Sequence, residues 1–128
     1  MNIEHQQYRV WREENSNTLY FRGRIRLHGQ TDRQPLNDLL DDTIRSNSAT
    51  MTWDFQELDF INGSGLDVIY RKVIRISRDC PSMNLLVRGC DSIPWQQSAL
   101  PNIKKLMPAV RLKFEANAPI LAPTNGAA

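Results

Sequence analysis

The residues with the clearest capacity for chemistry lie in the segment Asn62-Gly63-Ser64-Gly65. Its two glycines allow a sharp turn and the close approach of another backbone. The segment follows an alternating strand and precedes an amphipathic helix, so the Ser64 hydroxyl is predicted to lie at a helix N-terminus. Free backbone N–H groups and the positive end of the helix dipole favour a phosphate there. Ser64 is therefore a candidate for regulatory phosphorylation.

Ser64 also has a purely structural interpretation. It stands three residues before Asp67, which is the spacing of a capping box with Asp in place of the usual Glu or Gln. In that case the Ser64 oxygen accepts a backbone hydrogen bond and serves only to begin the helix. Both interpretations stay open at the level of sequence.

The composition predicts one ordinary domain that needs neither a metal nor a disulfide. A chain of 128 residues can bury roughly two-thirds of the surface that its unfolded form exposes. Cys80 and Cys90 lack the spacing of metal ligands, and His5 and His28 are far apart in the sequence. We therefore expect reduced thiols and no cofactor. A net charge of +2 is too small by itself to indicate nucleic acid as a partner.

The N-terminal segment gives no sign of export. It is polar, and no apolar run in the sequence approaches the roughly 18 residues of a membrane span. The sequence therefore predicts a cytoplasmic protein.

Hydrophobic periodicity predicts strands that alternate with helices after an opening hairpin. The predicted elements, in chain order, are strands at 8–12 and 18–27, a helix at 34–46, a strand at 49–55, a helix at 64–77, a strand at 83–87, a short helix from Pro101 and a strand at 109–114. This order predicts an α/β fold with a mixed sheet and helices packed mainly on one face. The domain is expected to span residues 1–115, followed by a disordered tail at 116–128 that has little to bury.

Two groups of charged residues have competing interpretations. Arg22, Arg24 and Arg26 alternate along the second strand, and they form either a solvated sheet face or a surface that binds phosphates. The first helix carries acidic residues that suggest a metal site, but no matching ligands occur nearby, so a solvated acidic face is favoured. These residues are Asp38, Asp41 and Asp42.

The second main helix is predicted to have one apolar stripe and one basic face. The stripe comprises Leu66, Ile69, Tyr70, Val73 and Ile74. The remaining face is dominated by Arg71, Lys72, Arg75 and Arg78. An acidic partner surface would be attracted to this basic face, whereas the alternative is simply a solvated side of a helix.

Several of these motifs together resemble the STAS domain, the fold of anti-sigma factor antagonists and of sulfate-transporter tails. The resemblance covers approximately residues 8–114, and its most specific parts are the strand at 19–25 with its central glycine and the segment from Thr52 through the Phe60-Ile-Asn-Gly-Ser-Gly-Leu66 turn. The segment 93–108 is further similar to a cyanobacterial subgroup of stand-alone STAS-like regulators.

The resemblance implies a non-enzymatic regulator in a partner-switching circuit. In such a circuit a serine kinase, which is also the anti-sigma-type partner, binds and phosphorylates the antagonist, and a PP2C-type phosphatase reverses the mark. The family turn commonly contains Asp followed by the modified hydroxyl. Here Asn62 stands in the Asp position, Gly63 stands where the acceptor usually is, and Ser64 matches the second hydroxyl. Either modification occurs at Ser64, or partners are exchanged without phosphorylation of the turn.

The predicted partner-binding surface combines the turn with the basic side of the following helix. Its members are Asn62, Gly63, Ser64, Gly65, Arg71, Lys72 and Arg75. A rival hypothesis is a phosphorylation-independent scaffold or co-assembly module, in which neighbouring subunits cover this helix and the segment around Trp95. No nucleophile and base pair, phosphate loop or metal constellation indicates an enzyme.

Overall fold

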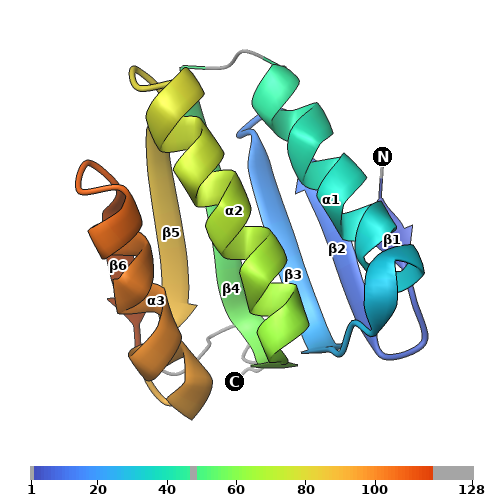
Figure 1. Ribbon diagram of the computed structural model, residues 1–128. Helices are drawn as coiled ribbons and strands as arrows, with labels where there is room; N and C mark the ends of the chain where they lie inside the picture. The colour runs from blue at the N-terminus through green and yellow to red at the C-terminus, as the bar shows by residue number, and fades with distance from the viewer. Residues whose placement is uncertain (1, 47–48, 117–128) are drawn as a thin grey trace.

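The computed structural model describes residues 2–46 and 49–116, which form one mixed sheet with helices on one face (Figure 1). The elements are β1 (Ile3–Glu4), β2 (Tyr8–Glu13), β3 (Thr18–Ile25), α1 (Gly29–Arg45), β4 (Thr50–Ile61), α2 (Gly63–Asp79), β5 (Asn84–Cys90), α3 (Pro94–Leu106) and β6 (Arg111–Glu115). The α/β fold with helices on one face, which the sequence predicts, is confirmed.

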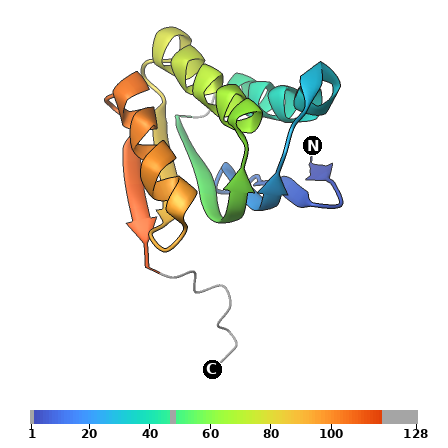
Figure 2. The same ribbon diagram turned by 60° about the horizontal axis from the view of Figure 1, so that its bottom comes forward.

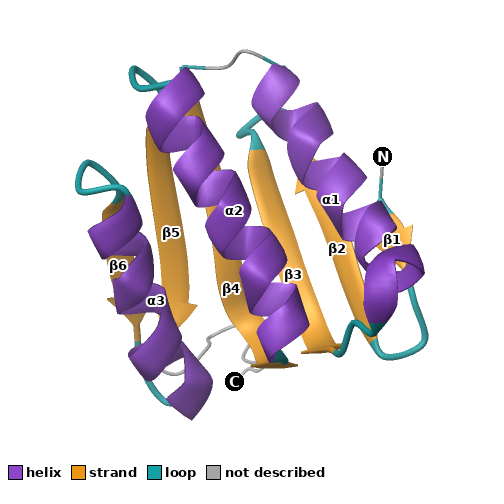
Figure 3. Ribbon diagram, viewed as in Figure 1, coloured by secondary structure: helices purple, strands orange, loops and turns teal. Residues whose placement is uncertain are grey.

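The spatial order of the strands follows their order in the chain, from β1 to β6. The β1–β2 and β2–β3 pairs are antiparallel, and the three remaining pairs are parallel. Parallel neighbours need crossover connections, and α1, α2 and α3 supply one each (Figure 3). Because the crossovers proceed in one direction and share one hand, all three helices lie over the same face.

The two faces of the central strand β4 differ in chemistry. Trp53 and Phe55 are almost completely buried under the helices and belong to the hydrophobic core. Asp54 and Gln56 point to the opposite face, on which the described chain places no helix (Figure 2). The sheet therefore has one face closed by helices and one face without helices, which we call the open face.

Two helices begin earlier in the chain than the sequence predicts. α1 includes residues 29–33, which were expected to form a loop, and the Asp32 carboxylate accepts a hydrogen bond from the His28 backbone N–H at 2.9 Å. α3 begins at Pro94, in a segment expected to be an irregular turn. Proline suits the first turn of a helix, and the Trp95 Nε1–H donates to the carbonyl of Leu58 at 2.8 Å, which anchors this start.

Three smaller differences concern strands and the chain end. β4 continues to Ile61 instead of ending near Phe55, and the two-residue strand β1 was not predicted. Apart from Ala116, the predicted tail lies outside the described residues. None of the helices in the described ranges is long and apolar enough to cross a membrane.

Candidate protein-binding site

The turn before α2 is held in place by the side chain of Asn62. Its Oδ1 accepts hydrogen bonds from the backbone N–H groups of Gly65 at 3.0 Å and Leu27 at 3.2 Å, and its Nδ2 donates to the Leu27 carbonyl at 3.0 Å. The first bond caps α2, while the other two tie the helix start to the chain just after β3. An aspartate could not make the bond to the carbonyl, because a carboxylate has no donor. Asn62 is therefore a positioning residue of the turn.

The two glycines of the turn have opposite surroundings. A Cβ atom at Gly65 would lie 2.7 Å from Ile61 Cγ1 and 3.2 Å from Ile25 Cγ2, so only glycine fits there without displacement of its neighbours. A Cβ atom at Gly63 would have no neighbour within 4 Å, and this residue is exposed at the first position of the helix. Gly65 therefore lets the helix approach the sheet closely, whereas Gly63 is an open point on the surface.

Of the two interpretations of Ser64, the one in which it caps the helix is wrong. The helix begins at Gly63, so Ser64 lies inside its first turn, and the cap is Asn62. The helix starts earlier because the Asn62 side chain reaches the Gly65 N–H, which a serine at position 64 could not do. The Ser64 residue is half-buried.

α2 is rotated relative to the stripe that the sequence predicts. Its buried residues are Gly65, Val68, Ile69, Lys72, Val73 and Ile76. Ile74, which was predicted to be buried, is instead 43% exposed, and it is the one large hydrophobic residue with such exposure in the described ranges. The outward side of the helix therefore carries the residues Gly63, Asp67, Arg71, Ile74 and Arg78, which we call the outer stripe.

Lys72 does not belong to an exposed basic face, contrary to prediction. Only 8% of the residue is exposed, and its Nζ lies 2.7 Å from Oδ1 of Asp41 on α1. Arg75 Nη1 lies 2.5 Å from the same oxygen. The long aliphatic stem of Lys72 allows it to occupy an apolar seam while its ammonium meets a carboxylate. Asp41 is thus an interhelical ion-pair partner instead of part of a solvated acidic face.

Arg71 does lie on the surface, and a shared carboxylate connects it to α1. Arg71 Nε and Arg33 Nη2 both donate to Oδ2 of Asp67, each at 2.8 Å. The Arg71 side chain is 71% exposed. The hydrogen bond from Arg71 is the main cause that lowers the pKa of Asp67, and the charges of Arg71 and Arg33 act in the same direction. Asp67 is therefore ionised at neutral pH and holds the two guanidinium groups together.

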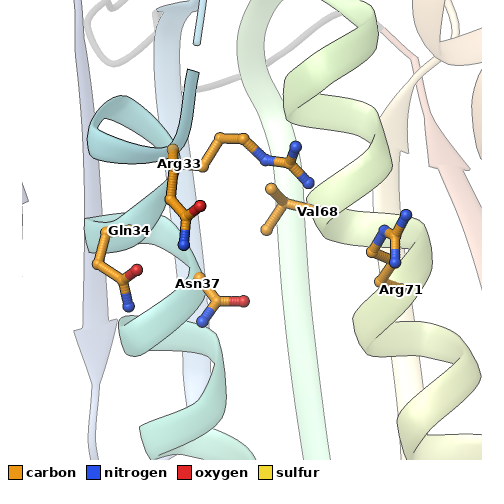
Figure 4. A pocket seen from close by; sticks show the side chains of 6 residues that line it. Arg33, Gln34, Asn37, Val68 and Arg71 are labelled. Atoms are coloured by element: carbon orange, nitrogen blue, oxygen red, sulfur yellow. The ribbon is translucent and has the colours of Figure 1, made fainter. Parts of the chain in front are cut away.

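A groove lies between α1 and α2 beside this ion-pair cluster (Figure 4). Its volume is about 360 Å³, and it is lined by Gln30, Arg33, Gln34, Asn37, Val68 and Arg71. Figure 4 shows the Arg33 side chain extending from α1 toward α2, with Val68 between the helices. Amide and guanidinium groups dominate the lining, so the groove offers many hydrogen-bond donors to a polar or acidic segment.

Arg33 and Asn37 were not among the predicted site residues. The reason for missing Arg33 is local, because its segment was taken as a loop before the first helix. Once residues 29–33 are helical, Arg33 and Asn37 fall four residues apart on one helix face, where side chains are neighbours.

The three arginines that alternate along β3 and beyond it, Arg22, Arg24 and Arg26, have different contacts in the structure. Arg22 pairs with Glu57 at 3.1 Å, whereas the guanidinium groups of Arg24 and Arg26 lie 5.0 and 4.9 Å from the ring centre of Phe60. Trp95, which the co-assembly hypothesis would place in a subunit contact, is half-buried and packs edge-on against Phe55. Within residues 2–46 and 49–116, no cluster of His, Cys, Asp or Glu could hold a metal ion.

This arrangement of sheet, helices and turn is the STAS-like fold, as the resemblance in the sequence predicts. SiaC of Pseudomonas aeruginosa superimposes with a TM-score of 0.69 at 9% identity, over 91% of this chain and 98% of that chain. SiaC in complex with the diguanylate cyclase SiaD, of which it is the activator, gives a TM-score of 0.69 at 9% identity over 91% and 99% of the two chains.

An anti-sigma factor antagonist from Mycobacterium paratuberculosis has the same fold, with a TM-score of 0.62 at 11% identity over 85% of this chain and 90% of that chain. Identities this low establish the fold alone. No protein-family model matches the sequence, and comparison with curated proteins finds no match.

Proposed function

We propose that this protein is a non-enzymatic regulator that binds a protein partner through the 62–65 turn, the outer stripe of α2 and the adjoining groove. The observation that carries the proposal is the contrast within the turn. Gly65 and Asn62 fix the backbone from inside, while Gly63 leaves an exposed, uncrowded point at the helix start. A partner backbone can approach such a point closely.

The structural neighbours support a role in protein recognition. One is an activator seen in complex with the enzyme that it activates, and another is an anti-sigma factor antagonist. For this chain we infer a partner of the serine-kinase or anti-sigma type, with a PP2C-type phosphatase to reverse any modification. Arg71 and Arg33 at the groove would attract an acidic partner segment and speed its association.

The corrected geometry also supports Ser64 as the residue that such a kinase would modify. With Asn62 as the helix cap, the Ser64 oxygen is not needed for capping. A phosphate in the first turn of α2 would be stabilised by the helix dipole, although Asp67 three residues later would oppose it. Because the added charge and bulk stand beside Gly63, modification would weaken a contact made through the open turn.

The Gly63→Trp substitution tests the binding site. The partner is first purified from native lysate on the immobilised unmodified protein, and its affinity for the variant is then measured. We expect binding to weaken more than about tenfold, which corresponds to about 1.4 kcal/mol. Lys105→Trp, at an exposed position of α3, is the matched control and should bind normally. Circular dichroism should show that both variants are folded. Unchanged affinity of the Gly63→Trp protein would reject the site.

The modification is tested separately with the purified kinase and ATP. Ser64→Ala should abolish incorporation of phosphate, and Gly63→Ser, which restores a hydroxyl at the usual family position, should add a second acceptor. If the Ser64→Ala protein incorporates as much phosphate as the unmodified protein, Ser64 is not the acceptor. If neither protein is phosphorylated, partner exchange without modification of the turn is favoured.

A further inference from the structure

The open face of the sheet contains a cavity that the proposed partner site does not use. Its volume is about 260 Å³, and its wall includes Trp11, Tyr20 and Phe21 from β2 and β3 and Arg88 and Glu115 from β5 and β6. Most sites for drug-sized ligands are larger, roughly 300–1,000 Å³. The size of this cavity therefore suits one or two apolar side chains.

The charged groups in the wall of the cavity already have partners. Arg88 Nη2 donates to Oε2 of Glu115 at 3.0 Å, and Oε1 of Glu57 lies 3.1 Å from Nε of Arg22. The Asp54 carboxylate accepts hydrogen bonds from the backbone and the side chain of the residue two positions further along β4. A charged ligand is therefore not needed to satisfy these groups.

Aromatic surface at the cavity, in contrast, stays in contact with water. The rings of Trp11 and Tyr20 are stacked, with centroids 5.3 Å apart, and the guanidinium group of Arg9 lies 4.3 Å from the ring centre of Trp11. Both aromatic residues are only half-buried, on the face of the sheet over which the described chain places no helix (Figure 2). Exposed aromatic surface beside a cavity favours contact with proline and aliphatic side chains.

The chain leaves the described region directly beside this cavity. Glu115 ends β6 and lines the cavity, and residue 116 is the last that the structure describes. The sequence from 117 to 128 contains no charged residue, and its large apolar side chains are confined to Pro119-Ile-Leu-Ala-Pro123, which we call the apolar segment. Two prolines favour an extended backbone, and extended proline-containing segments bind aromatic-lined grooves with little loss of conformational entropy.

The apolar segment is close enough along the chain to reach the cavity. Neighbouring strands are about 4.8 Å apart, so β4 and β3 lie about 10 and 14 Å from β6 across the sheet. The five residue steps from Glu115 to Ile120 span up to about 16 Å when extended. Ile120 and Leu121 are therefore within reach of the cavity, and so short a connection keeps them at an effective concentration in the millimolar range.

We propose that the apolar segment of this chain folds back over the open face and places Ile120 and Leu121 in the cavity, against the rings of Trp11 and Tyr20. The contact is apolar on both sides, so raised salt does not weaken it by screening. The apolar segment thereby covers part of the sheet face that the helices leave open. This contact lies on the opposite face from the outer stripe of α2 and does not depend on the proposed partner.

The test is NMR spectroscopy of the full chain labelled with ¹³C and ¹⁵N. We expect nuclear Overhauser contacts between the methyl groups of Ile120 and Leu121 and the ring protons of Trp11 and Tyr20. Their relative intensity should not change when the protein is diluted about tenfold, because the contact forms within one chain. Absence of these contacts would overturn the proposal. Loss of them on dilution would also overturn it, because it would show that the tail of a second copy occupies the cavity.

Variants of the apolar segment test the contact independently. Replacing both residues, Ile120→Asn with Leu121→Asn, should shift backbone amide signals near positions 11, 20, 54 and 88. The matched control, Ala127→Asn with Ala128→Asn, adds the same two side chains outside the apolar segment and should leave those signals in place. Equal shifts in the two proteins, or shifts confined to α2, would contradict the proposal.

A peptide of residues 116–124 added in trans measures the strength of the contact. It should bind the protein with asparagine at 120 and 121 with a dissociation constant of about 1 mM, and the unmodified protein at least about threefold more weakly because its own tail competes. In the asparagine protein, Tyr20→Ala should weaken peptide binding at least about threefold, whereas Arg111→Ala, at an exposed position of β6, should not. Equal affinity for the asparagine and unmodified proteins would overturn the proposal. If Tyr20→Ala proves unfolded, the Overhauser contacts and the asparagine variants still decide the question.

Discussion

The inner and outer sides of α2 use the same residue types for opposite purposes. Each side has a glycine in the first turn, which is Gly65 on the inner side and Gly63 on the outer side. Each side also has a basic residue near the middle of the helix, which is Lys72 on the inner side and Arg71 on the outer side. Inside, Gly65 permits close packing and Lys72 joins α1 through Asp41. Outside, Gly63 has no close neighbour and Arg71 borders the groove. Residue type alone therefore does not identify the proposed binding surface, because the rotation of the helix decides which glycine and which basic residue are exposed.

The glycine pair gives the largest expected difference in stability. Gly65→Ala should lower the free energy of unfolding by about 2–3 kcal/mol, because the added methyl group meets Ile61 and Ile25 in a packed region. Gly63→Ala should leave it unchanged or raise it by up to about 1 kcal/mol, because alanine favours the helical backbone. Urea denaturation of both proteins checks this. Equal losses would show that the two glycines do not differ as described.

Substitution of the inner basic residue Lys72 should also lower the free energy of unfolding more than substitution of the outer residue Arg71, but the difference should be smaller than for the two glycines. Lys72→Ala removes a buried aliphatic stem and one partner of Asp41, so we expect a loss of about 1–2 kcal/mol. Arg75 continues to pair with Asp41, which keeps the loss below that of a fully unpaired buried charge. Arg71→Ala removes an exposed pair and should cost less than about 0.5 kcal/mol. A larger loss for Arg71→Ala in the same denaturation assay would contradict this assignment.

The Asn62→Asp substitution tests how the 62–65 turn is held. It keeps the acceptor that caps the helix but removes the Nδ2 donor to the Leu27 carbonyl. We expect the free energy of unfolding to fall by about 1 kcal/mol at neutral pH. Acidification should reduce the difference from the unmodified protein, because a protonated carboxyl can donate to that carbonyl. A difference that stays constant as the pH falls would argue against the bond to Leu27 as its cause.

The smallest expected effect concerns Asp67 on the outer stripe. Since the Arg71 hydrogen bond is the main cause of its lowered pKa, Arg71→Ala should raise that pKa toward the ordinary value of 3.8. The contact between Asp67 and Arg71 stabilises the folded protein fully above pH 3.8. This contribution disappears as the pH falls through the lowered folded-state pKa of Asp67. Titration of the Asp67 side-chain carboxyl signal by NMR measures the shift. An unaltered pKa in the variant would mean that Arg33 alone holds the carboxylate.

Much of the fold follows from local patterns, but the details of the site depend on distant contacts. Alternating strands, the turn at 62–65 and the second helix are visible in the sequence because each has its own hydrophobic period. Lys72 was assigned to the exposed face because its burial depends on Asp41, 31 residues away. The capping bond of Asn62 to Gly65 is local, but the two bonds that join Asn62 to Leu27 span 35 residues. Neither Asp41 as the partner of Lys72 nor Leu27 as the partner of Asn62 can be identified from local spacing.

The exposed apolar residue Ile74 has the same explanation. A stripe with helical spacing that starts at Leu66 includes Ile74. In the structure, however, Gly65 is the residue that lies against Ile61 of the sheet. Compared with the predicted stripe, the buried side of α2 is shifted toward Val68 and Ile76, and Ile74 lies on the outer stripe. The set of exposed residues on α2, and with it the proposed binding surface, therefore depends on a close backbone approach that hydropathy alone does not measure.

Site-specific photo-crosslinking tests the central claim most directly, because it identifies the partner and the surface that contacts it in one experiment. A photoreactive residue at position 74 or 78 of the outer stripe should give the same single protein adduct in native lysate, and one at position 105 on α3 should not. Adduct formation at 74 should fall when unlabelled protein competes, and Gly63→Trp competitor should be less effective. An adduct that forms equally well at position 105, or competition that is unaffected by Gly63→Trp, would contradict binding through the turn and the outer stripe.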